Sequence, residues 1–466
     1  MQSTINDMID TKKKNSGLMT SGNIYLKILA FSIPLLLGNL FQLMYNTIDS
    51  VVVGKYVGSE ALAAVGSASP VINLVIGFFM GLAVGAGVVV SRYYGARRIE
   101  EERTAIHTFL AFSFLFGIVL SVLSLFLASY ILQWIGVPED VFPSADVYLS
   151  IYFAGTVFVT VYNAGTGILQ AVGDARSPLI FLGISSILNV FLDLLFVREF
   201  GLGVAGVAYA TVICQAVAAL LVIMTLKCTK QEYRISFKQM RINMPILIQM
   251  IRIGVPSGIQ NMIVSFSNVI VQADVNSFGS AAMAGFSSAN KFDNFVGMPI
   301  NSFTLAVTTF TGQNLGAKRF DRVKKGVHAG LIMSIAVVLC MGFIVYTNAE
   351  TCISFFTADS AVIANGSTLL RIMCPFYIFL CFHQIYSGAL RASGRSNIPM
   401  VTSIMAFVVI RQIYLYFAMK YINDISVVGW GYSFTWILAA AFTSLYYFGS
   451  HWLSREEQKS AASING

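Results

Sequence analysis

Long apolar runs, separated by short polar segments, recur along this chain from residue 24 to residue 452. Each run approaches or exceeds the roughly 20 residues that an α-helix needs to cross the hydrocarbon core of a bilayer. The pattern predicts an all-α integral membrane protein with twelve transmembrane helices. We place them at about residues 24–53, 61–91, 104–132, 146–170, 178–197, 204–226, 246–276, 282–312, 326–347, 362–391, 398–420 and 427–452.

The first of these runs carries a polar stripe. Asn39, Gln42, Asn46 and Asp49 are spaced by three or four residues, which places them on one face of a helix. A carboxylate in hydrocarbon costs at least about 2.5 kcal/mol. We therefore expect this face to turn toward the protein interior or toward a water-filled cavity.

A second polar pair lies in the fifth predicted helix, where Asn189 and Asp193 are one helical turn apart. Asp49 and Asp193 are thus two intramembrane carboxylates in one half of the chain, each with an amide on its own face. Such oxygens suit a small cation, whereas a buried carboxyl group can instead carry a proton. Thr211 in the sixth helix can add a hydroxyl. The alternative is that these side chains only tie helices together.

The second half of the chain has no carboxylate at the matching positions. Its seventh helix keeps an uncharged polar stripe of Asn261, Ser265, Asn268 and Gln272, with Asp274 only near the outer end. We therefore expect ion coupling in the first half and a cavity for a larger solute in the second. Arg411 is either a structural tie or a cavity residue. Lys291 and Asp293 point about 200° apart on a helix and are not expected to pair.

Short motifs recur at one offset of 221 residues. Gly95-Ala96-Arg97-Arg98 returns as Gly316-Ala317-Lys318-Arg319, and His107 as His328. The same spacing relates Gly58-Ser59 to Gly279-Ser280, and Gly167, Gly173 and Pro178 to Gly388, Gly394 and Pro399. The chain is therefore predicted to contain two six-helix lobes, related by a pseudo-two-fold axis along the membrane normal. We expect an N-terminal tail at 1–22, lobes at 23–226 and 246–452, a linker at 227–245 and a C-terminal tail at 453–466.

Basic residues indicate how the helices are oriented. Of the 30 lysines and arginines, 24 fall in the two tails and in alternate loops, whereas only Lys55, Arg198 and Lys420 fall in the loops of the other side. Cations collect on the cytoplasmic side of membrane proteins. Both termini, including Lys12, Lys13 and Lys14, are thus predicted to be cytoplasmic.

Composition excludes several classes of function. Only 11% of the residues are charged, against about 25% in soluble domains, so the net charge of +8 reflects loop cations rather than binding of nucleic acid. The sequence has no phosphate-binding loop for ATP and no recognised hydrolase motif. Its six cysteines show no metal-binding spacing. We therefore do not expect an enzyme, a cofactor or a structural metal. We expect a monomer in the lipid bilayer.

These features resemble the MATE multidrug and toxin extrusion transporters over residues 20 to 455, and most of all the bacterial DinF-type branch. The resemblance is carried by Tyr45-Asn46-x-x-Asp49, Gln170-Ala171-x-Gly173-Asp174 with Pro178, Asn189-x-x-x-Asp193, and Gln313-Asn314-Leu315-Gly316-Ala317. It implies export of amphipathic, often cationic compounds, driven by H⁺ or Na⁺. It also implies cation coupling at Asp49, Asn189, Asp193 and Thr211, and a cavity wall that includes Gln42 and Tyr45.

One departure concerns the second lobe. NorM-type relatives place a Glu in the seventh helix and an Asp in the tenth, where this chain has Val264 and Leu380. The function expected is a secondary multidrug antiporter of the bacterial plasma membrane, with Asn46, Asn261, Asn268 and Arg411 as further candidate cavity residues. The main alternative is a lipid-linked oligosaccharide flippase of the same superfamily, which would need a cationic cavity. A channel and an intramembrane enzyme are the remaining alternatives.

Overall fold

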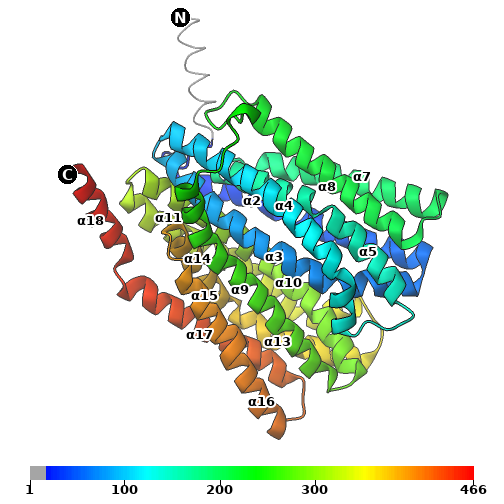
Figure 1. Cartoon of the computed structure of the whole chain (residues 1–466). Helices are drawn as coiled ribbons and strands as arrows, with labels where there is room; N and C mark the ends of the chain where they lie inside the picture. The colour runs from blue at the N-terminus through cyan, green and yellow to red at the C-terminus, as the bar shows by residue number, and fades with distance from the viewer. Residues whose placement is uncertain (1–16, 466) are drawn as a thin grey trace, which may run out of the picture. The chain divides into compact units, whose positions relative to one another are not determined.

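The computed structural model describes residues 17–465, and every regular element in that range is a helix (Figure 1). The predicted tail residues Lys12, Lys13 and Lys14 lie outside the described residues. The first half contains α2 (Ile24–Val52), η1 (Val53–Val57), α3 (Ser59–Gly95), α4 (Ile99–Ile135), α5 (Phe142–Ala154), α6 (Thr156–Ala171), α7 (Arg176–Leu194), η2 (Leu195–Glu199) and α8 (Gly203–Cys228).

A short 3-10 turn, η3 (Phe237–Gln239), lies in the segment that joins the halves. The second half contains α9 (Met244–Asn276), α10 (Ser280–Gly316), α11 (Phe320–Thr347), α12 (Ala349–Ser354), α13 (Ser360–Met373), η4 (Cys374–Phe376), α14 (Tyr377–Ala392), α15 (Asn397–Ser403), η5 (Ile404–Ile410), α16 (Arg411–Tyr421), α17 (Ser426–Gly449) and α18 (Trp452–Asn465).

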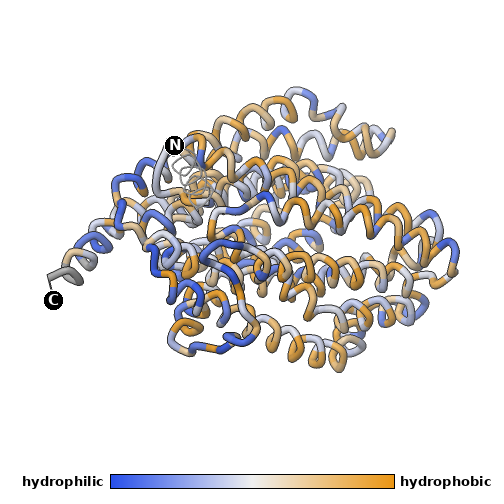
Figure 2. The backbone as a smooth tube through the Cα atoms, turned by 90° about the horizontal axis from the view of Figure 1, so that it is seen from above, coloured by the Kyte–Doolittle hydropathy of each residue, from blue (hydrophilic) through white to orange (hydrophobic). Residues whose placement is uncertain are grey.

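The helices account for the twelve predicted spans. Among the described residues, eight spans are long and apolar enough to cross a membrane, and α5 with α6 forms a ninth that bends by 49° at Gly155. The remaining three, α9, α10 and α17, have the required length, but α9 and α10 are richer in polar side chains and α17 is rich in aromatic ones. Figure 2 shows hydrophobic residues along the helices and hydrophilic ones gathered mainly at helix ends and loops. The all-helical membrane fold predicted from the sequence is confirmed.

The described chain folds into two compact units. The first unit takes in residues 33–254 and the second takes in residues 19–32 and 255 onward. Two helices, α2 and α9, therefore change unit part of the way along their length. The lobe limits predicted at 23–226 and 246–452 differ from these unit boundaries and stay a prediction.

The repeated sequence motifs are helix ends. Arg97 and Lys318 have φ of 56° and 57°, in the left-handed region. The amide after each of them bonds the carbonyl five residues back, Arg98 to Tyr93 at 3.0 Å and Arg319 to Asn314 at 2.8 Å. This is the Schellman pattern of helix termination. The repeat therefore preserves the turns that end corresponding helices.

Gln313 and the nearby Arg322 attach the N-terminal segment to the second unit. Gln313 Oε1 accepts the backbone N–H of Met19 at 2.8 Å. Arg322 donates from Nη1 to the Gly22 carbonyl at 3.0 Å and from Nη2 to the Met19 carbonyl at 3.2 Å. Because these bonds satisfy the backbone just before α2, the start of that helix is held by the second unit.

Candidate functional site

A cavity of about 510 Å³ lies within the first unit. Residues of α2, α3, α5, α6, α7 and α8 line it, and many of them are polar or aromatic. Its polar lining consists of Asn39, Gln42, Tyr45, Asp49, Ser69, Asn73, Tyr148, Tyr152, Tyr162, Asn163, Thr166, Gln170, Thr211 and Gln215. Among the described lining residues, Asp49 is the only one with a charged side chain. The cavity is therefore polar and acidic.

Asp49 and Asp193 meet at this cavity. Their carboxyl groups come from α2 and α7 and lie close enough to interact electrostatically. Asp193 is fully buried. Within the described residues, Asp49 Oδ1 and both carboxyl oxygens of Asp193 are buried without a hydrogen-bond partner. Two carboxylates in contact repel each other unless a proton or a cation lies between them.

Asn189 extends this group of unsatisfied polar atoms. It is fully buried one turn before Asp193, and neither atom of its amide has a conventional hydrogen-bond partner among the described residues. The thiol of Cys214 on α8 lies beside it. Buried polar groups are nearly always paired in proteins, so this group has the composition of a site for an ion.

Thr211 contributes a hydroxyl group to the lining of the same cavity. Thr211 is buried on α8, and the Tyr45 hydroxyl donates to its Oγ1 at a long 3.5 Å. Gln42, Tyr45, Asp49 and Thr211, four residues predicted from the sequence, thus line one cavity. Asn189 and Asp193 reach it through the contact with Asp49. The side chain of Asn46 lies outside the described part of the structure.

A π-helical turn follows each of the two carboxylates. Asp49 lies four residues before η1, and Asp193 lies two residues before η2. The two turns contact each other. π-turns widen a helix locally and often occur at functional sites. The sequence predicted continuous helices here, because hydrophobic periodicity does not report a change of one residue per turn.

Arg411 is fully engaged inside the second unit. It is buried at the start of α16 and donates to Thr435 Oγ1 from Nε at 3.3 Å and from Nη2 at 3.1 Å, and to Asn268 Oδ1 from Nη1 at 3.3 Å. Its guanidinium also stacks 4.2 Å from the Tyr432 ring centroid. This geometry favours the alternative in which Arg411 ties helices together, over the one in which it lines a cavity. Asn268 and Asn261 both lie on α9, and Asn261 is exposed.

Lys291 and Asp293 have separate partners, in agreement with the angle expected between them. The Lys291 ammonium lies 4.3 Å from the centroid of the Phe356 ring. Asp293 Oδ1 accepts the Tyr377 hydroxyl at 2.7 Å.

Several cavity residues were missed by sequence reasoning. Tyr148 and Tyr152 come from α5, and Asn163 and Gln170 from α6. The spacing of four residues between Tyr148 and Tyr152 was a usable signal, because it places both rings on one face. It could not be separated from the many aromatic residues that pack or face lipid.

These features define the class: a multi-pass membrane protein built from two repeated six-helix halves. The MatE family model matches residues 34–195 and again residues 256–417, once in each half. The chain belongs to the MatE family, and the resemblance to MATE transporters drawn from the motifs is confirmed. The narrower DinF-type assignment stays a prediction.

Relatives and solved structures agree with this assignment. The probable multidrug resistance protein YoeA of Bacillus subtilis is 31% identical over 415 residues, which cover 87% of this chain and 88% of that protein. The multidrug export protein MepA of Staphylococcus aureus is 23% identical over 389 residues, 83% of this chain and 86% of that protein. An outward-facing multidrug resistance MATE family transporter has the same fold, with a TM-score of 0.88, 24% identity and coverage of 95% and 99%.

Proposed function

We propose that this protein is a secondary active multidrug efflux antiporter, which exports amphipathic organic compounds in exchange for H⁺ or Na⁺ by alternating access of its two lobes. The observation that carries this proposal is the contact between Asp49 and Asp193 at a cavity with no other charged lining residue among those described. The multidrug names of the relatives support it independently.

The acidic pair supplies the coupling in this proposal. A proton between Asp49 and Asp193 would remove their mutual repulsion, and Na⁺ would find oxygen ligands in both carboxylates, Asn189 and Thr211. Either ion would stabilise the packing that brings α2 and α7 together. A ligand shifts a conformational equilibrium only by its difference in affinity for the two states. The ion must therefore bind more weakly in the conformation that releases it to the cytoplasm.

The cavity suits a cationic amphipathic substrate. Its volume of about 510 Å³ lies inside the range of about 300–1,000 Å³ found for drug-sized ligands. Tyr45, Tyr148, Tyr152 and Tyr162 present aromatic surface, which attracts organic cations as well as apolar groups. A cationic substrate and the coupling ion would compete for the negative charge of Asp49, and this competition is the basis of exchange.

The basic loops support an orientation with both termini in the cytoplasm of the bacterial plasma membrane. We infer that the transporter works as a monomer and without ATP. The flippase alternative is less well supported, because a lipid-linked pyrophosphate needs cations. The described lining of the cavity contains no Lys or Arg, and Arg411 is held by Thr435 and Asn268.

The test is ethidium transport into everted membrane vesicles, where the direction of export is inward, with the Na⁺ gradient and the pH gradient varied independently. Asp49→Asn is expected to abolish gradient-driven transport, because the amide cannot exchange a proton or neutralise a cation. Asp274→Asn, in α9, is the matched control and is expected to transport normally. Gradient-driven efflux at the wild-type rate in Asp49→Asn would refute the coupling role.

A further inference from the structure

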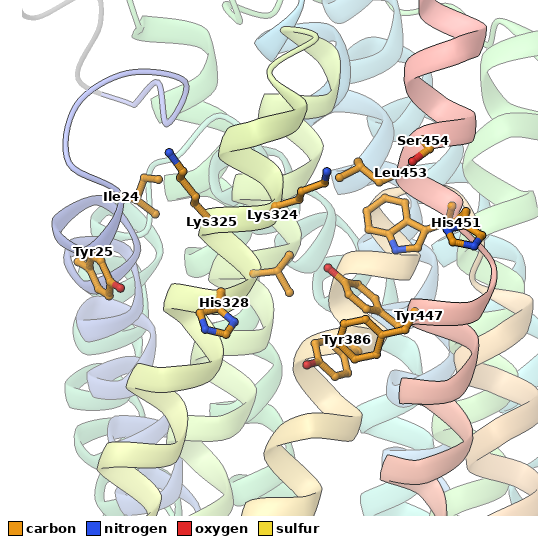
Figure 3. A pocket seen from close by; sticks show the side chains of 13 residues that line it. Ile24, Tyr25, Lys324, Lys325, His328, Tyr386, Tyr447, His451, Leu453 and Ser454 are labelled. Atoms are coloured by element: carbon orange, nitrogen blue, oxygen red, sulfur yellow. The ribbon is translucent and has the colours of Figure 1, made fainter.

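A second pocket, of about 680 Å³, lies within the second unit (Figure 3). It is bounded by the first turn of α2, the first turns of α11, the middle of α14, the end of α17 and the start of α18. Aromatic rings form part of its wall. Tyr386 and Tyr447 stack with ring centroids 4.3 Å apart, and Trp452 packs against Tyr447 at 5.6 Å.

Basic side chains gather in this pocket. Lys324, Lys325, His328 and His451 line it, and all four are exposed. Figure 3 shows Lys324 extending toward Leu453 on α18 and Lys325 extending toward the start of α2. Among the described residues, no carboxylate lies within 4 Å of either ammonium group. The pocket thus presents two cations that form no ion pair with any described residue.

Acidic residues close in sequence do not neutralise these lysines. Asp321 and Glu457 are exposed and do not line the pocket. Glu456, on α18, pairs instead with Arg395 at 3.7 Å. The positive charge of Lys324 and Lys325 is therefore available to an anion from outside the chain.

The internal repeat identifies the positions of the first unit that correspond to this pocket. Backbone groups of the chain itself occupy them. His107 corresponds to His328, but it is buried. Its Nδ1 lies 2.7 Å from the Arg103 carbonyl oxygen, and its Nε2 accepts the Ser236 N–H at 2.9 Å. Arg103, the counterpart of Lys324, donates to the Glu232 carbonyl at 2.9 Å. The segment after α8 thus supplies backbone groups to the basic helix start of the first unit.

In the second unit the corresponding segment, after α17, leaves this position open. It continues as α18, whose first residues line one side of the pocket without bonding Lys324 or His328. The same two repeat positions therefore have backbone partners in one unit and none among the described residues of the other. Such a difference is expected if a ligand fills the second position.

The rim of the pocket is apolar and exposed. Tyr25 is 50% exposed and Phe448 is 64% exposed, and their neighbours Leu26 and Leu445 are 65% and 71% exposed. These side chains belong to helices assigned to the membrane, where exposed apolar side chains suit contact with lipid tails. Cations above lipid-facing apolar side chains, with Tyr and Trp between them, are the arrangement found at the headgroup level of a bilayer.

We propose that this pocket binds the headgroup of an anionic glycerophospholipid, with Lys324 and Lys325 at its phosphate and the acyl chains along Tyr25 and Phe448. Basic pockets between helices on the cytoplasmic side suit such headgroups. A bound lipid would connect the start of α2 to α11 and α18. The apolar rim distinguishes this ligand from a free anion, which would need no such surface.

The test uses the full-length protein, purified and delipidated in detergent, with thermal unfolding followed as lipid is added. Dioleoylphosphatidylglycerol is expected to raise the Tm, whereas dioleoylphosphatidylcholine and inorganic phosphate are not. For Lys324→Ala/Lys325→Ala, the concentration of phosphatidylglycerol that gives half of the shift should rise about 30-fold, at about 1 kcal/mol per basic residue.

Two further variants separate charge from folding. Lys324→Arg/Lys325→Arg keeps both charges and should keep the response. Lys230→Ala/Lys238→Ala removes two exposed lysines from the segment between the units and should respond like the wild type. The proposal is overturned if phosphatidylcholine or phosphate raises the Tm as much as phosphatidylglycerol does. An unchanged lipid response in Lys324→Ala/Lys325→Ala would overturn it equally.

Discussion

Asp193 is the residue whose environment most requires an ion. It is fully buried, and neither oxygen of its carboxyl group has a hydrogen-bond partner among the described residues. An isolated charge of this kind is strongly disfavoured away from water. In the proposed mechanism, a proton or Na⁺ at this position would stabilise the folded protein as well as couple transport.

This leads to a prediction for Asp193→Asn. A ligand that binds only the folded state at 100 times its dissociation constant stabilises that state by about 2.7 kcal/mol. The wild-type Tm should therefore rise when the coupling ion is added, either as Na⁺ or as protons at lower pH. The variant has lost one of the two carboxylates and should lose this response, as measured by thermal unfolding at matched ionic strength. An equal ion response in both proteins would contradict the assignment.

Lys318 offers a test of the repeated helix ends. It is exposed and has φ of 57°, which costs a non-glycine residue about 1 kcal/mol. Glycine adopts this conformation freely, so Lys318→Gly should raise stability by up to about 1 kcal/mol. The neighbouring Arg319 has φ of −97°, where glycine brings no relief. Arg319→Gly should not stabilise the protein, and a higher Tm in both variants would show that charge, not backbone conformation, was responsible.

Residue-level prediction succeeded where the helix pattern itself held the information. The spacing of Asn39, Gln42 and Asp49 was enough to place them on one helical face, and all three line one cavity. Arg411 could not be resolved in this way. Its partners Thr435 and Asn268 lie 24 and 143 residues away in sequence, so only the fold distinguishes a tie from a cavity residue.

At the scale of helices, α2 and α9 are the elements that change unit. The change falls between residues 32 and 33 in α2 and between residues 254 and 255 in α9. Pro34 and Pro256 lie within two residues of these points. A proline inside a helix removes one backbone hydrogen bond and permits bending. We infer that both helices would bend at these prolines in the alternating access proposed above.

Pro34→Ala and Pro256→Ala test this inference. Each variant can restore a backbone hydrogen bond, which contributes about 1 kcal/mol. A barrier higher by that amount slows transport about fivefold. Pro70→Ala and Pro299→Ala, inside α3 and α10 and away from the unit boundary, are the controls and should slow transport less. Equal rates in all four variants, at equal amounts of folded protein, would argue against a hinge at the boundary.

The ends of the helices could be predicted only in part from the sequence. Gly173 and Gly394, which the repeat analysis paired, lie two residues after the ends of α6 and α14, with φ values of 89° and 80° that glycine adopts without steric cost. The π-turns η1, η2 and η5 have no comparable signal in the sequence. They depend on packing around Val53–Val57, Leu195–Glu199 and Ile404–Ile410, and apolar runs look alike whether they form an α-helix or a π-turn.

Over the whole molecule, the two halves repeat in fold but differ in charge. The first unit holds the Asp49–Asp193 pair, whereas the second places Arg411 among hydroxyl, amide and aromatic groups and bonds Asp293 to Tyr377. The sequence showed this asymmetry because no carboxylate recurs at the matching positions. It could not give the volume of the cavity or the contact between the acidic groups, since both depend on how distant helices pack.

Ion movement coupled to drug movement tests this account most directly. Purified protein is reconstituted into proteoliposomes that contain a pH-sensitive or Na⁺-sensitive dye, and ethidium is then added outside. The account predicts that ethidium uptake by wild-type protein drives H⁺ or Na⁺ outward, and that Asp49→Asn and Asp193→Asn abolish this ion flux. Ethidium transport without any accompanying ion flux in the wild type, or unchanged flux in both variants, would contradict it.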